Sequence, residues 1–541
     1  MRCTTLYASL VTSLVALSEA FSHRSTCTKF NFQHALPKEA TVLSTAFVEA
    51  GGSYGEGAPD IAYPSNSTYL PELCAVIVNV TTSAISSYRF GLFLPSQWND
   101  RFLAVGNGGF AGGINWLSMG NGVTYGHAVV STDTGHNSTS LDVSWALDNE
   151  EKRKDFGFRA IHGSVVLGKA LTEAFYLRDI QYSYYTGSST GGRQGLKEVQ
   201  LHADSFDGVL IGAPAWWTSH QQPWTSKVAT YNLPVSSPNH IPSDLFAVIA
   251  NQVVKHCDIL DGVVDGIVSS PSECNLESLE LACDTETANA SACLTAPQLQ
   301  TLQEIYANYT VDGQLIFPGM ELGSEATWSM LLSGDAPSGL GDGYIQNFVL
   351  NDPDWTWEQY NDSIVSLAEK IDPGECTAWD YSSLDKFRDR GGKLFLFHGL
   401  ADGGIVPRSS GVFYERTLAL LGGLDAVRDW FRLFYIPGME HVGDTPVGAP
   451  WFISGGSQAS RLGSNAWAGR NRLEDPQHDA LLALMDWVEN GMVIKQVIAT
   501  TWTNSTDPTS GVLRQRPLCP YPEKQVYIGG NEKVPESWKC V

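Results

Sequence analysis

The chain alternates between short, almost wholly apolar runs and longer stretches in which apolar residues recur every third or fourth position. The short apolar runs are typical of buried strands and lie at 102–105, 128–132, 208–212, 393–397 and 431–436. A further run at 181–186 is rich in Tyr and Thr, which favour strands. Helical spacing occurs at 158–177, at 193–202, and from Asp475-Pro476 to Gly491. This alternation predicts an α/β fold with a parallel sheet covered by helices on both faces.

The alternation stops between residues 216 and 390. There the composition shifts toward Pro, Asp and Trp, and four cysteines cluster together. We interpret residues 216–390 as an inserted domain that divides the core into residues 21–215 and 391–541.

The N-terminal residues are typical of a secretory leader. Arg2 precedes an apolar stretch at 6–17, and Ser18-Glu19-Ala20 places small residues three and one positions before a cut after Ala20. The sequence therefore predicts a signal peptide at 1–20 and a secreted, extracellular protein. A buried first helix is the alternative. No later apolar run is long enough to span a bilayer.

The charge of the chain excludes two classes of partner. The formal net charge is −24 at pH 7. An acidic surface repels phosphate backbones and anionic lipid headgroups, so we expect neither nucleic acid nor membrane as a partner.

Cysteines and glycosylation motifs agree with secretion. Nine cysteines follow the predicted leader. Spacing favours four disulfides and leaves Cys376 unpaired, although spacing alone does not fix connectivity; the four are Cys27–Cys74, Cys257–Cys274, Cys283–Cys293 and Cys519–Cys540. The N-x-[ST] sites, which suit a glycoprotein, are Asn66, Asn79, Asn137, Asn289, Asn308, Asn361 and Asn504.

A candidate nucleophile lies between a β-prone run and a helical one. The pentapeptide at 187–191 has the form G-x-S-x-G, which in a strand–turn–helix context is typical of a nucleophile elbow. The register makes Ser189 the nucleophile and Ser188 its neighbour, and the Thr190 N–H can face a developing oxyanion. The alternative is a Gly/Ser-rich turn without chemistry.

A base and an orienting acid follow in the order that α/β-hydrolases use. Asp402 comes after the strand at 393–397, and His441 comes after the strand at 431–436. Loops at the carboxyl ends of parallel strands meet at one edge of the sheet, where such folds bind ligands. His398 competes as the base but precedes the acid. The alternative for Asp402 and His441 is a pair of ordinary polar loop residues.

The order of these motifs resembles the tannase and fungal feruloyl esterase family over nearly the whole mature chain. The matching stretches are "FLAVGNGGFAGGI" (102–114), "VVSTDTGH" (129–136), "YYTGSSTGGRQG" (184–195), "FDGVLIGAPA" (206–215), "RGGKLFLFHGLADGGIVP" (390–407) and "RLFYIPGMEHVGD" (432–444). The resemblance implies an α/β-hydrolase core with a lid domain inserted between nucleophile and acid.

The resemblance also assigns roles and an activity. It implies Ser189 as nucleophile, Asp402 as orienting acid and His441 as general base and then general acid, with the Gly109 N–H as second oxyanion donor. The implied activity is hydrolysis of small-molecule esters of hydroxycinnamic or gallic-type acids through an acyl-enzyme. Two alternatives stay open: action on a specialised-metabolite ester, perhaps by acyl transfer, and a non-catalytic aryl- or glycoside-binding protein.

The sequence departs from the family beside the triad. In the family, cysteines typically precede the nucleophile and follow the catalytic histidine, and their disulfide ties the two loops together. Here Ser188 and Val442 occupy these positions. We interpret Ser188 as a replacement for that crosslink, not as a second nucleophile.

The inserted domain contains a candidate calcium site. Asp258, Asp261 and Asp265 present three carboxylates beside two glycines, and hard oxygen ligands suit Ca²⁺. Their spacing is not that of an EF-hand, and a solvated acidic loop is the alternative. The resemblance implies a structural calcium ion held by these side chains and by the carbonyls of Val263 and Ile267.

Aromatic residues are frequent in the same domain. Their faces could grip a phenolic ring, although burial in the core is the better interpretation for any one of them; the tryptophans are Trp216, Trp217, Trp224, Trp328, Trp355, Trp357 and Trp379.

Overall fold

The structure is a computed structural model that describes residues 23–283, 292–453, 458 and 475–541. The predicted signal peptide at 1–20 and the predicted glycosylation site Asn289 lie outside these residues. Within the described ranges, no helix is both long enough and apolar enough to cross a membrane.

Nine strands of the described chain form the central sheet, in the order β1-β4-β5-β7-β6-β8-β9-β12-β13. Six neighbouring strands are parallel, and the sequence predicts all six. They are β7 (Ala128–Thr132), β6 (Arg101–Val105), β8 (Tyr182–Ser188), β9 (Gly208–Gly212), β12 (Lys393–Gly399) and β13 (Phe431–Ile436). Three antiparallel strands, which the sequence analysis did not predict, extend the sheet: β1 (Ala40–Val48), β4 (Leu73–Thr81) and β5 (Ser87–Pro95).

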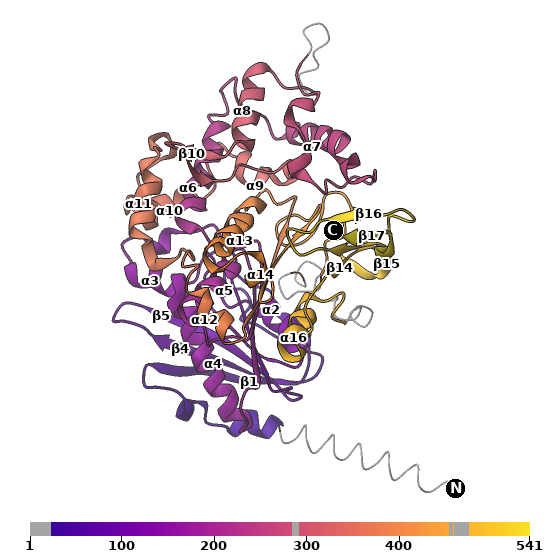
Figure 1. The fold of residues 1–541 in the computed structure, drawn as a ribbon. Helices are drawn as coiled ribbons and strands as arrows, with labels where there is room; N and C mark the ends of the chain where they lie inside the picture. The colour runs from indigo at the N-terminus through magenta and orange to yellow at the C-terminus, as the bar shows by residue number, and fades with distance from the viewer. Residues whose placement is uncertain (1–22, 284–291, 454–457, 459–474) are drawn as a thin grey trace, which may run out of the picture.

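Helices cover both faces of this sheet, as the sequence predicts (Figure 1). Along β6, Phe102 and Ala104 join a hydrophobic core with α4 (Ala160–Tyr176) and α5 (Thr190–Leu201). The alternate residues Leu103 and Val105 join a second core, which contains side chains of α2 (Trp116–Val123) and α16 (Ala480–Asn490). Because successive side chains of a strand point to opposite faces, a strand that is apolar at every position needs cover on both sides.

One helix begins later than predicted. The spacing places its start at Asp475-Pro476, but α16 begins at Ala480. The N-cap is Asp479, whose carboxylate accepts the Leu481 and Leu482 N–H groups at 2.9 and 3.2 Å. Asp475 instead accepts the Gln477 N–H at 2.8 Å and stabilises a turn before the helix.

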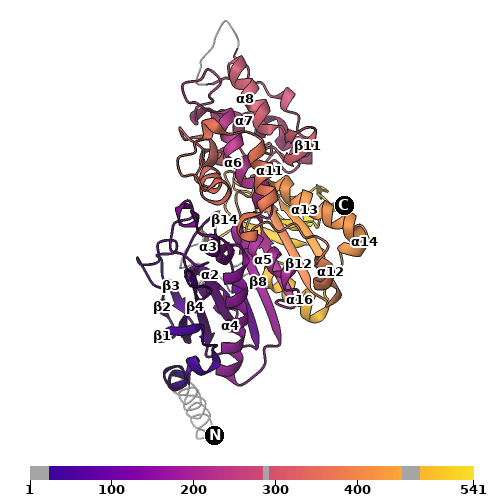
Figure 2. The same ribbon diagram turned by 90° about the vertical axis from the view of Figure 1, so that its left-hand side faces the viewer.

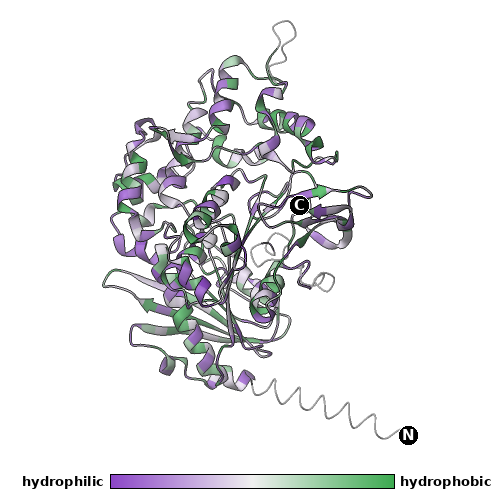
Figure 3. Cartoon of the chain, viewed as in Figure 1, coloured by the Kyte–Doolittle hydropathy of each residue, from purple (hydrophilic) through white to green (hydrophobic). Residues whose placement is uncertain are grey.

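Between β9 and β12 the chain leaves the sheet and forms a largely helical body beyond one end of it (Figures 1 and 2). Its main elements are α6 (Thr218–Tyr231), α7 (Asp244–Cys257), α8 (Ala296–Tyr306), β10 (Tyr309–Val311), β11 (Gln314–Phe317) and α11 (Ser363–Ile371). Hydrophobic and hydrophilic residues alternate around these helices (Figure 3), as expected of helices with one buried side. The lid boundaries at 216 and 390 stay a prediction.

After β13 the chain returns to the sheet through α16 and ends in small antiparallel hairpins. These pair β14 (Val497–Asn504) with β15 (Asp507–Leu518), and β16 (Gln525–Tyr527) with β17 (Trp538–Cys540). The structure contains the four predicted disulfides, Cys27–Cys74, Cys257–Cys274, Cys283–Cys293 and Cys519–Cys540. Cys376 is buried, and among the described cysteines it has no disulfide partner.

Candidate active site

Ser189 lies on a sharp turn between β8 and α5. Its backbone has φ 59° and ψ −125°, a conformation outside the regions that L-residues usually adopt. The neighbouring glycines make the turn sterically feasible. A Cβ on Gly187 would lie 2.8 Å from the Gly191 carbonyl carbon, and one on Gly191 would lie 2.9 Å from the Asn107 oxygen. The strand–turn–helix geometry is that of a nucleophile elbow.

Asp402 and His441 are hydrogen-bonded, with 2.7 Å between Asp402 Oδ2 and His441 Nδ1. Asp402 follows β12 and is fully buried, whereas the His441 side chain is 25 % exposed. The other carboxylate oxygen of Asp402 accepts the N–H groups of Gly404 and Ile405 at 2.8 and 2.9 Å. Burial alone would raise the pKa of Asp402, but His441 and His398 outweigh burial and hold the pKa below its usual range.

His398 is a supporting residue, a role that the sequence analysis did not foresee. Its ring is fully buried, and Nε2 lies 3.2 Å from Asp402 Oδ2 and 2.9 Å from the Ile405 oxygen. Nδ1 lies 2.8 Å from the Ser410 hydroxyl. His398 therefore helps to hold the carboxylate oxygen that contacts His441, and because its ring is fully buried its position does not suit a general base. A histidine directly at the end of β12 was the only signal in the sequence.

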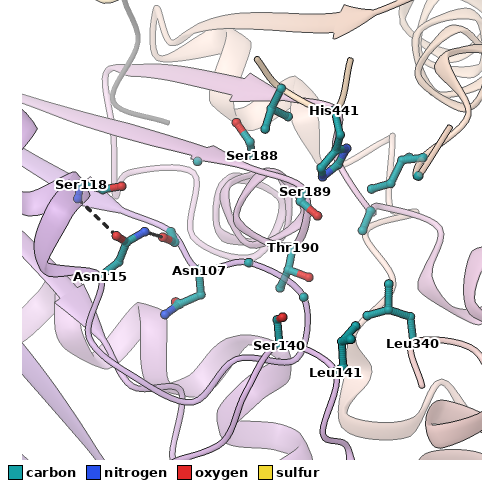
Figure 4. Close-up of a pocket in the computed structure, with 18 of the residues that line it drawn as sticks. Asn107, Asn115, Ser118, Ser140, Leu141, Ser188, Ser189, Thr190, Leu340 and His441 are labelled. Atoms are coloured by element: carbon teal, nitrogen blue, oxygen red, sulfur yellow. Dashed lines mark hydrogen bonds between the residues drawn. The ribbon is translucent and has the colours of Figure 1, made fainter. Parts of the chain in front are cut away.

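A pocket of about 460 Å³ contains Ser189, His441 and Thr190 in its wall. Figure 4 shows the Ser189 side chain beside the His441 ring, while Ser188 points away from that ring. The remaining wall comes from α2, from the loops after β6, β7, β9 and β12, and from the inserted domain; its apolar members are Leu117, Leu141, Ala215, Met330, Leu340 and Ile405. The structure thus brings the three predicted triad residues to one edge of the sheet.

Two backbone N–H groups in the pocket wall are available to an oxyanion. Thr190 is the first residue of α5, where an N–H has no partner within the helix. In the loop after β6, the Gly108 N–H donates to Tyr63 Oη at 2.9 Å and the Phe110 N–H to the Ser140 oxygen at 2.9 Å. Among the described residues, no hydrogen-bond acceptor meets the Gly109 N–H, and its role as second oxyanion donor stays a prediction.

Ser188 and Val442, at the positions of the family's cysteine pair, both line the pocket. The Ser188 hydroxyl is buried, and no hydrogen-bond partner for it occurs among the described residues. Val442 is buried and has φ 57°, which is unfavourable for a β-branched residue. The loop after His441 is therefore held in a strained conformation without a covalent link.

The predicted calcium ligands lie together at the end of α7. The Asp258 carboxylate is buried and accepts the N–H groups of Asp265, Gly266 and Ile267 at 2.9 to 3.2 Å. Burial raises the pKa of Asp265. The neighbouring Asp261 and Asp258 act in the same direction, while two arginines oppose them. Three carboxylates gathered in one partly buried loop are the chemistry that attracts a divalent cation.

The other donors also fit a hard cation. Among the described residues, no hydrogen-bond donor reaches the carbonyl oxygens of Val263 or Ile267. Two arginines of β15 compensate part of the negative charge: Arg514 Nη1 lies 3.0 Å from Asp265 Oδ2, and Arg516 contacts the same oxygen. The calcium site therefore stays a prediction: the three carboxylates share one loop, but N–H groups and the two arginines already contact them.

The tryptophans do not form the pocket. Trp216, Trp217, Trp224, Trp328 and Trp355 are buried. None of the described residues that line the pocket is a tryptophan. Burial in the core, the better interpretation from the sequence, therefore holds for these five tryptophans, and the possibility that they grip a substrate ring does not apply to this pocket.

The sheet order, the covering helices and the elbow serine define an α/β-hydrolase. Residues 74–541 match the family described as tannase and feruloyl esterase. The chain therefore belongs to the tannase and feruloyl esterase family.

Relatives and solved structures agree with this assignment. The chain is 33% identical over 532 residues to probable feruloyl esterase B-1 of Aspergillus fumigatus, with 96% of each chain covered. It is 31% identical over 529 residues to probable feruloyl esterase B of Aspergillus niger, with 97% of each covered. The crystal structure of feruloyl esterase B from Aspergillus oryzae superposes with a TM-score of 0.87 at 30% identity, covering 96% of this chain and 100% of that chain.

A more distant structure shares the fold. Tannin acyl hydrolase from Aspergillus niger superposes with a TM-score of 0.71 at 22% identity, covering 95% of both chains. On these relationships the chain is a carboxylic ester hydrolase. This sets aside the alternative of a non-catalytic binding protein.

Proposed function

We propose that the protein is a secreted serine hydrolase that cleaves esters of hydroxycinnamic or gallic-type acids through an acyl-enzyme. The observation that carries the proposal is the 2.7 Å hydrogen bond between Asp402 and His441 Nδ1, with His441 and the elbow serine in the wall of one pocket. Because Nδ1 is engaged with the carboxylate, Nε2 is the ring nitrogen left to accept the Ser189 proton.

The chemistry follows from this arrangement. Ser189 Oγ attacks the ester carbonyl carbon while His441 Nε2 accepts the hydroxyl proton. The N–H groups of Thr190 and Gly109 stabilise the negative oxygen of the tetrahedral intermediate. When the intermediate collapses, the C–O bond to the alcohol breaks and His441 returns the proton to the leaving oxygen. A water molecule then attacks the acyl-enzyme by the same route and releases the acid.

The pocket wall supports an acid of modest size with an apolar body. Leu141, Met330, Leu340 and Ile405 supply apolar surface, and a volume of about 460 Å³ lies within the range of small-ligand pockets. Several relatives have names that describe them as probable feruloyl esterases B. We therefore extend the substrate class of those names to this chain.

The substrate class is tested with methyl ferulate, methyl caffeate, methyl p-coumarate, methyl gallate and methyl butyrate as substrates of the purified protein. Preference for one of the aromatic esters, by kcat/KM, supports the proposal. Equal or better turnover of methyl butyrate would contradict it, while leaving the ester hydrolase class intact.

Secretion, glycosylation and calcium binding complete the proposal. Five of the predicted glycosylation sites are exposed, as a glycan requires: Asn66, Asn137, Asn308, Asn361 and Asn504. Asn79, in contrast, is partly buried. Disulfides agree with an oxidising compartment. We propose that Asp258, Asp261, Asp265 and the carbonyls of Val263 and Ile267 hold a structural Ca²⁺.

A further inference from the structure

Two histidines and a glutamate meet between the helices α4 and α5, away from the active site. His162 lies near the start of α4, Glu198 lies in the last turn of α5, and His202 is the C-cap of α5. One ligand atom from each side chain lies within 4.8 Å of the other two. We propose that these three residues form a binding site for a transition-metal ion of the Zn²⁺ type.

The donor set is typical of such an ion. Zinc binds imidazole nitrogen and carboxylate oxygen at about 2.0–2.2 Å, and sites with two histidines and one glutamate leave a fourth position for water. The distance from His162 Nδ1 to Glu198 Oε1 is 2.8 Å, and the His162 and His202 rings stack with 3.4 Å between their centroids. Because a metal lies in the plane of each imidazole that binds it, binding one ion requires the stacked His162 and His202 rings to rotate out of their stack.

The carboxylate beneath the rings is incompletely satisfied. Glu198 is 1% exposed, and its Oε1 also accepts the Ser205 hydroxyl at 2.7 Å. Its Oε2 is buried and has no hydrogen-bond partner among the described residues. A buried carboxylate oxygen without a partner costs free energy, and a metal ion is a ligand that would satisfy it.

Both rings are partly exposed, so an ion can enter from solvent.

The position of the site indicates a structural effect. The helix α5 begins directly after Ser189, and His202, which follows its last residue, lies 13 positions after Ser189, about 20 Å along the helix axis from the nucleophile. An ion at this site would crosslink α4 to the helix that carries the elbow at its other end. We expect it to stabilise the fold without entering the ester chemistry.

The experiment titrates zinc into the untagged full chain and measures binding by isothermal calorimetry. Thermal unfolding is then measured with and without zinc, and calcium is present in excess in both measurements. We expect one zinc per chain, a higher melting temperature with zinc, and visible d–d absorption bands when cobalt replaces zinc. His202→Gln should raise the zinc dissociation constant by at least about tenfold, because it removes one of three protein ligands. His162→Gln, which can keep the hydrogen bond to Glu198, should do the same.

The matched control is His34→Gln, because His34 is an exposed histidine outside the cluster. This variant should bind zinc as the wild type does. Absence of zinc binding, or equal zinc affinity in the wild type and His202→Gln, would overturn the proposal and leave His162 and Glu198 as an ordinary hydrogen-bonded pair.

Discussion

His441 Nδ1 and Asp402 Oδ2 lie 2.7 Å apart although 39 residues separate them in the chain. The parallel strands β12 and β13 make this contact, because they end side by side and place their following loops at one edge of the sheet. The contact fixes the orientation of the imidazole and is the basis of the first prediction.

Asp402→Asn should lower kcat by roughly 10³–10⁴-fold, because an amide can favour the wrong tautomer of the histidine and cannot stabilise its positive form. Steady-state kinetics on the best aromatic ester measures the loss, with Asp425→Asn as the control because the Asp425 side chain is 92% exposed. Loss of less than about tenfold in Asp402→Asn would show that another group orients His441.

A buried histidine beside the loop after β6 makes stability depend on pH. His136 Nε2 lies 2.9 Å from the Phe110 oxygen, and burial lowers the pKa of His136 from 6.5 to about 4. The unfolded chain therefore takes up a proton at a higher pH than the folded chain. The stabilisation due to this histidine is full above pH 6.5 and is lost as the pH falls toward 4, by about 3 kcal/mol in total.

His136→Asn should remove this pH dependence, and urea unfolding at several pH values between 4 and 7 measures it. Burial also raises the pKa of Asp133 to about 6, which changes stability in the opposite sense over the same range. The difference between wild type and variant isolates His136, since Asp133 is present in both. A difference that stays constant from pH 7 to pH 4 would contradict the assignment of a buried neutral histidine.

Removal of calcium should destabilise the protein. A ligand that binds the folded state and is present at about 100 times its dissociation constant contributes about 2.7 kcal/mol, so chelation should lower the melting temperature. Asp261→Asn should reproduce part of the loss, whereas Asp425→Asn should leave the calcium response unchanged. Identical melting curves with calcium and with chelator would identify the loop as acidic but metal-free.

The sequence predicts the parallel half of the sheet well but not its antiparallel edge. Strands such as β7 and β9 are buried at every position, and an uninterrupted apolar run is their signal. In β1, buried and exposed residues alternate only irregularly, and a bulge between Val42 and Ser44 breaks the period. The strand β1 forms through its pairing with β4, and a local sequence pattern does not reveal which strand it will pair with.

In the site, too, the sequence predicts some residues and not others. Ser189, Asp402 and His441 are predictable because each follows a recognisable strand in a fixed order. The pocket wall is different: Leu141, Met330 and Leu340 come from loops and from the inserted domain, and no periodicity marks them. The tryptophans do not indicate the pocket wall either, because large apolar side chains are most often buried in the interior, as the sequence analysis favours for each of them.

The adjacent serines allow a direct test of the elbow register. Ser189→Ala should lower kcat by at least about 10⁴-fold, because acylation then has no nucleophile. Ser188→Ala should keep most of the activity, since the Ser188 hydroxyl points away from His441 and removing it takes a buried group without a partner out of the pocket wall (Figure 4). If both variants fold normally and are equally inactive, the predicted register of the elbow, with Ser189 as the nucleophile, is wrong.

The most direct test of the account is covalent labelling. The protein is treated with a serine-directed fluorophosphonate, digested, and analysed by mass spectrometry across the peptide that contains both Ser188 and Ser189. The account predicts one phosphonate per chain, located on Ser189 and absent from Ser189→Ala. A label on Ser188, or no label on a folded protein, would contradict the claim that Ser189 is the nucleophile of a serine esterase.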